Sequence, residues 1–144
     1  MRYILIVLVI IIIGVVFVMA LYNSSKKMEG EMVDVMLMKS DRRIRKDILK
    51  LTPIGSSMEE VVKVVENNEK WEIDWIWDNR GYGIDKNGIP GEPDEDSNLV
   101  GAKSISADIG CYYIPLKTYV TVYWGFDENS KLIEIAVRKD IDTL

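Results

Sequence analysis

The residues from Tyr3 to Leu21 form an apolar run without a charged side chain, and this run constrains the chain more than any other feature. As a helix it would extend roughly 28 Å at about 1.5 Å per residue, close to the bilayer hydrocarbon thickness of about 30 Å. The sequence therefore predicts a transmembrane anchor over residues 1–22 that contacts membrane lipid through residues 3–21. A cleavable signal peptide ending near Ala20 is the alternative interpretation.

The charges that flank this run leave the orientation open. Arg2 precedes the run, whereas Lys26 and Lys27 follow it, and the positive-inside rule alone would place the following domain in the cytoplasm. A very short amino-terminal tail before a signal-like segment more often stays inside, so that the following chain is exported. We therefore expect a single-pass plasma-membrane protein whose domain lies on the extracytoplasmic side.

Composition narrows the classes of function for the rest of the 144-residue chain. The formal net charge of −5 disfavours nucleic acid as a partner, because nucleic-acid binding requires basic patches. Histidine is absent, so the commonest acid–base catalyst and nitrogen ligand for metals is missing, and no cofactor is predicted. The single cysteine, Cys111, cannot form an intramolecular disulfide.

Periodicity divides the chain beyond the anchor into a spacer with an amphipathic helix, residues 23–50, and a small domain, residues 51–144. Apolar residues recur at helical spacing from Glu31 to Leu51, with basic residues between them. After a break at Pro53 and Gly55, either Ser56 with Glu59 or Ser57 with Glu60 forms a capping box, which predicts a second helix.

Four strands are predicted next, over residues 71–78, 103–113, 118–126 and 132–139, and strict alternation in the first places Trp71, Ile73, Trp75 and Trp77 on one face. Residues 79–98 between the first two strands read as a long acidic loop. The expected fold is α+β: an N-terminal transmembrane helix, then two helices packed on one face of a four-stranded antiparallel sheet.

Two segments resemble a known family. The helix start Ile54-Gly55-Ser56-Ser57-Met58-Glu59-Glu60-Val61 and the closing hairpin from Val120 to Leu132 are similar to the domain shared by SmpA/OmlA-type (BamE-like) lipoproteins and β-lactamase-inhibitor-like proteins. The resemblance covers about residues 51–140. It implies a non-enzymatic domain that binds other proteins through a sheet face and loops. No lipidated cysteine follows the leader, so a plasma-membrane protein of a single-membrane bacterium fits as well as an outer-membrane one.

These observations favour a membrane-anchored, non-enzymatic protein-binding or scaffold domain. One alternative is ligand or ion sensing by the acidic loop 79–98. Another is a hydrolase that uses a carboxylate pair, Asp74 with Asp78 or Glu92 with Asp94. The loop does not match the EF-hand pattern, because Gly83 occupies the position where the first carboxylate is required. The residues expected to contact a protein partner are Trp75, Trp77, Tyr82, Asp85, Tyr112 and Tyr113.

Overall fold

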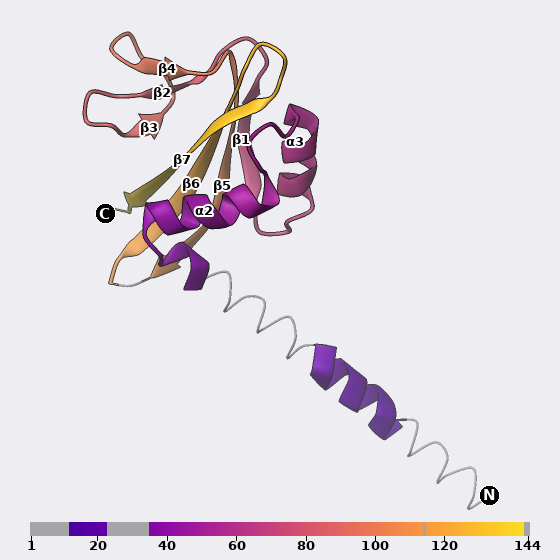
Figure 1. Ribbon diagram of the computed structural model, residues 1–144. Helices are drawn as coiled ribbons and strands as arrows, with labels where there is room; N and C mark the ends of the chain where they lie inside the picture. The colour runs from indigo at the N-terminus through magenta and orange to yellow at the C-terminus, as the bar shows by residue number, and fades with distance from the viewer. Residues whose placement is uncertain (1–11, 23–34, 114, 143–144) are drawn as a thin grey trace, which may run out of the picture. The chain divides into compact units, whose positions relative to one another are not determined.

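The computed structural model describes residues 12–22, 35–113 and 115–142. The chain divides into two compact units, Met1–Val35 and Met36–Leu144. In the first unit, residues 12–22 are helical (Figure 1). Among the described residues, the second unit contains strands β1 to β7 and the helices α2 and α3.

The predicted transmembrane anchor requires correction. Within the described residues, no helix is both long enough and apolar enough to cross a membrane. The helix over residues 12–22 reaches roughly half of a hydrocarbon core of about 30 Å, and residues 3–11 of the expected span lie outside the described residues. This finding contradicts the predicted single-pass anchor over residues 1–22 and the plasma-membrane location that was inferred from it.

The second unit is built around a four-stranded antiparallel sheet with the strand order β1-β5-β6-β7 (Figure 1). All four strands begin and end close to their predicted positions. Alternate residues of β6 point to opposite faces, so Trp124 lies on one face and Tyr123 on the other. The strands are β1 (Glu72–Trp77), β5 (Lys103–Tyr113), β6 (Lys117–Phe126) and β7 (Leu132–Ile141).

The two helices, α2 (Asp41–Leu51) and α3 (Met58–Glu66), pack against different edge strands. Helix α2 contacts β7, whereas α3 contacts β1. This arrangement contradicts the expectation that both helices pack on one face of the sheet. The physical reason is that each helix is short and fully buries only two side chains, a stripe too narrow to cover four strands. The buried side chains are Ile44 and Ile48 in α2 and Val61 and Val65 in α3.

Residues 79–98 are not a plain loop, because six of them (82–84, 90, 91 and 98) lie in strands of a second, three-stranded sheet in the order β3-β2-β4. The fully buried Tyr82 anchors this small sheet by packing on Tyr123 of β6, with ring centroids 5.7 Å apart. Glycines and prolines interrupt the segment so often that its short strands carry no alternating pattern. The strands are β2 (Tyr82–Ile84), β3 (Pro90–Gly91) and β4 (Asn98–Val100).

A β-bulge in β1 changes which residues share a face. The register with β5 shifts between Ile73, which pairs with Ala107, and Trp75, which pairs with Ser106. Ser106 is in turn paired with Tyr123, so Trp75 lies on the Tyr123 face, while Ile73 lies on the Trp124 face. The prediction that the tryptophans and Ile73 share one face is therefore wrong, because an inserted residue reverses the alternation.

Candidate functional site

A groove of about 690 Å³ lies between α3 and the edge strand β1. Its volume is in the range of ligand sites in proteins. Apolar side chains and charged side chains of both signs line the groove. The helix contributes Met58, Glu59, Val62, Lys63 and Glu66, with Ser57 at its start. The sheet side contributes Ile76, Asp78, Lys103 and Ser130.

The helix wall of this groove is fixed at its amino-terminal end. The Glu60 backbone N–H donates to the Ser57 hydroxyl at 3.3 Å, and the Ser57 N–H donates to the Glu60 carboxylate at 2.6 Å. The bond from the Ser57 backbone N–H to the Glu60 carboxylate, followed by the Ser57 side chain, lowers the pKa of Glu60, and the reciprocal pair of bonds confirms one of the two predicted capping boxes. The Met58 N–H donates to the Ser130 carbonyl at 3.0 Å, which ties the helix start to the turn between β6 and β7.

The sheet side of the groove includes Ile76 of β1, an edge strand. Strand β1 stands at the end of the strand order, with β5 on one side and no further strand on the other in the described part of the chain. Ile76, which pairs with the buried Ile105, leaves 47% of its surface exposed in the groove. An edge strand presents unpaired N–H and C=O groups, which can accept another strand. The apolar floor of the groove therefore lies beside a strand whose outer edge has no neighbouring strand among the described residues.

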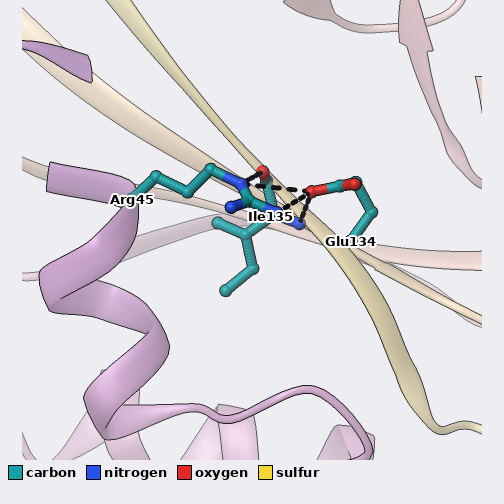
Figure 2. A network of polar contacts seen from close by, with 3 residues as sticks. All are labelled: Arg45, Glu134 and Ile135. Atoms are coloured by element: carbon teal, nitrogen blue, oxygen red, sulfur yellow. Dashed lines mark hydrogen bonds and ion pairs between the residues drawn. The ribbon is translucent and has the colours of Figure 1, made fainter. Parts of the chain in front are cut away.

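The opposite edge of the sheet is closed by an ion pair from α2 (Figure 2). The Arg45 Nε donates to the Ile135 carbonyl at 2.8 Å, and the Ile135 N–H donates to the Glu134 carboxylate at 2.9 Å. The Arg45 guanidinium also donates to the same Glu134 oxygen. The Ile135 N–H and C=O are thus both bonded to side chains. In a sheet that continued past β7, a neighbouring strand would bond these two groups instead.

Two further contacts involve β7 on the C-terminal side of this clamp, which we define as Arg45, Glu134 and the Ile135 backbone. The Arg138 guanidinium donates to the Pro90 carbonyl of the small sheet at 3.4 Å. The Lys139 ammonium donates to the Lys39 carbonyl, ahead of α2. Strand β7 is therefore contacted by α2 and the preceding residues at one point and by the small sheet at another.

The structure separates the six side chains that the sequence suggested for partner binding. Trp75 and Trp77 stack with ring centroids 4.7 Å apart on the Tyr123 face of β1, next to the groove but on the other side of the strand. Tyr82 is fully buried, and burial raises the pKa of its hydroxyl. It therefore has no surface to offer a partner.

The remaining three side chains have local roles or lie at the far end of the sheet. The Asp85 carboxylate accepts the backbone N–H groups of Asn87 and Ile89, both at 2.8 Å, and so forms the turn before β3. Tyr112 lies beneath the Lys139 ammonium at 5.4 Å, while Tyr113 at the end of β5 is 68% exposed. None of the three lines the groove.

The carboxylate pairs that the sequence suggested do not form a common centre. Asp74 accepts a hydrogen bond from Ser106 at 2.9 Å on the Tyr123 face, whereas Asp78 lines the groove. Asp94 accepts from Ser97 and from the Asp96 N–H and so shapes its own turn. Among the described residues, no three acidic or cysteine side chains converge to hold a metal ion.

Sequence reasoning missed the apolar floor of the groove, which consists of Met58, Val62 and Ile76. The predicted second helix and the predicted strand over residues 71–78 contain these residues, but no role was predicted for them. One signal was present: Trp75-Ile76-Trp77 is a run of three apolar residues within an alternating strand. Such a run indicates that both faces of the strand are apolar at that point.

No protein-family model, curated protein or solved structure matches the chain. The resemblance to SmpA/OmlA-type and β-lactamase-inhibitor-like proteins over residues 51–140 therefore stays a prediction. The groove and the two sheet edges provide the basis for a functional assignment.

Proposed function

We propose that this chain is a protein-binding domain that accepts an extended segment of its partner as an additional strand at the free edge of β1. The observation that carries the proposal is the groove between α3 and this edge. In strand addition, main-chain hydrogen bonds supply affinity, while side-chain pockets supply specificity. Strand β1 offers the main-chain groups, and the floor formed by Met58, Val62 and Ile76 offers the side-chain pocket.

The contrast between the two edges supports this assignment. Proteins commonly protect exposed strand edges, because an unprotected edge pairs with other chains. Arg45 and Glu134 protect β7 in this way. At β1, by contrast, α3 stands beside the edge with a groove of about 690 Å³ between them, enough space for the side chains of an added strand.

A displayed library of random octapeptides, selected on the full chain, tests this proposal. Selected peptides should bind the wild-type chain and lose at least about tenfold in affinity for Val62→Lys, because a buried ammonium would occupy the apolar floor. Val64→Lys is the matched control: Val64 is also half-buried on α3 but does not line the groove. Failure to enrich any peptide, or equal binding to the Val62→Lys chain, would overturn the proposal.

A further inference from the structure

The two sides of β1 differ in chemistry at the edge where a strand would be added. On the α3 side, an added strand meets the apolar floor, with Ile76 at its centre. On the Tyr123 side it meets the carboxylates of Glu72 and Asp74, and then the stacked indoles of Trp75 and Trp77. Successive side chains of any added strand point alternately to these two sides.

The carboxylates on the Tyr123 side make this part of the edge electronegative. Glu72 pairs with Asp108 of β5, and Asp74 is bonded to Ser106 on the same face. Burial, and then the nearby charges of Asp74 and Glu72, raise the pKa of Asp108. Strand β1 itself, Glu72–Trp77, contains no basic residue, and the nearby Arg80 guanidinium lies over the Trp77 ring at 5.5 Å, at the opposite end of the strand from Glu72.

Resting on the proposed strand addition, we infer that the occupant of this edge is an extended segment in which apolar residues alternate with lysine or arginine. Its apolar side chains enter the groove over Ile76. Its basic side chains lie opposite Glu72 and Asp74, and their aliphatic stems pack along the Trp75 indole, because Arg80 already lies over the Trp77 ring. Opposite charges on paired strands attract, and long basic side chains readily cover apolar surface while their charged ends stay in water.

Three synthetic octapeptides test this inference on the full chain, with tryptophan fluorescence as the readout because two indoles lie at the edge. Each has valine at alternate positions, with lysine, serine or glutamate between. The lysine peptide makes two favourable charge pairs with the edge, where the glutamate peptide makes two unfavourable ones. The lysine peptide should therefore bind at least about tenfold more tightly, as measured by Kd. This difference should shrink at about 1 M salt, where the Debye length is about 3 Å.

Two variant chains separate charge from shape. Glu72→Gln with Asp74→Asn removes both charges but keeps an acceptor for Ser106, and it should abolish the preference for lysine. Glu92→Gln with Asp96→Asn removes two exposed charges from the small-sheet region as the matched control and should leave the preference unchanged.

The outcomes distinguish this inference from the proposed function. Equal affinity for the three peptides would overturn the basic occupant and leave strand addition standing. If none of the three binds and the octapeptide library also yields nothing, strand addition itself fails. Concentration-dependent self-association that Val62→Lys abolishes would make a second copy the occupant and would also overturn the inference.

Discussion

The two edges of the four-stranded sheet show how one fold can close one strand and leave another available. At β7, the backbone of Ile135 is bonded to Arg45 and Glu134, and the small sheet adds a contact through Arg138. At β1, α3 lies alongside but leaves a groove, and Ile76 stays half exposed. A helix next to an edge strand therefore does not by itself close that edge. Closure at β7 depends on a side chain that reaches the backbone.

The largest expected effect on stability comes from truncating a fully buried side chain in each helix. Ile48→Ala should lower the free energy of unfolding by about 3 kcal/mol, and Val65→Ala by roughly 2 kcal/mol, because both side chains are fully buried. Chemical denaturation measures both changes. Ile48→Ala should also promote self-association, since it loosens the helix that carries Arg45, whereas Val65→Ala should weaken peptide binding. Self-association of Val65→Ala together with weaker peptide binding by Ile48→Ala would contradict the comparison of the two edges.

Thr52→Val tests the link between the end of α2 and the sheet. The buried Thr52 hydroxyl accepts a hydrogen bond from the Trp124 indole at 3.0 Å. Valine has nearly the same shape but no acceptor, so the indole N–H would be left unpaired, at a cost of about 1–3 kcal/mol. Thermal unfolding measures the loss. Thr52→Ser keeps the hydroxyl and should recover most of the stability; a valine variant as stable as wild type would refute the role of this bond.

Arg45→Ala opens the clamp on β7 directly. The side chains of Arg45 and Glu134 are 39% and 44% exposed, so solvent screening limits the expected loss of stability to about 1 kcal/mol. The more informative result is association, measured by sedimentation: we expect more dimer than in the wild type, because the Ile135 carbonyl then loses its hydrogen-bond donor at the edge of the sheet. Arg43→Ala, an exposed arginine on the same helix, is the control and should remain like wild type.

The smallest expected effect on stability concerns the ion pairs that Asp47 of α2 forms with Lys39 and Lys50. Hydrogen bonds from Lys39 and Lys50 lower the pKa of Asp47 to about 2. A lowered folded-state pKa stabilises the protein above the unfolded pKa of about 3.9, and this stabilisation is lost as pH falls toward 2. NMR titration of the Asp47 carboxyl group should show this pKa and its rise in Lys39→Ala. A normal Asp47 pKa in the wild-type chain would contradict the prediction.

Local patterns in the sequence predicted much of the second unit. The four main strands and the start of α3 follow from alternation and from the Ser57–Glu60 capping box, because these signals lie within a few residues of one another. The clamp could not be predicted in this way, since Arg45 and Glu134 are far apart in the chain and meet only through tertiary packing.

The candidate site was less accessible to sequence reasoning than the fold. The bulge between Ile73 and Trp75 reverses the faces of β1, and no single-residue pattern indicated it. A count of apolar residues in the leader likewise predicted a membrane span that the described residues do not provide. The groove depends on where α3 lies relative to β1, and the start of α3 is held by long-range contacts such as the bond from Met58 to Ser130.

Amide hydrogen exchange, read by NMR with and without the valine–lysine octapeptide, tests the central contrast most directly. We expect alternate amides of Glu72–Trp77 to exchange rapidly in the free chain and to become protected at saturating peptide. The Ile135 amide, which is already bonded to Glu134, should be protected in both states. Protection gained at β7 instead of β1, or at neither edge, would contradict the account.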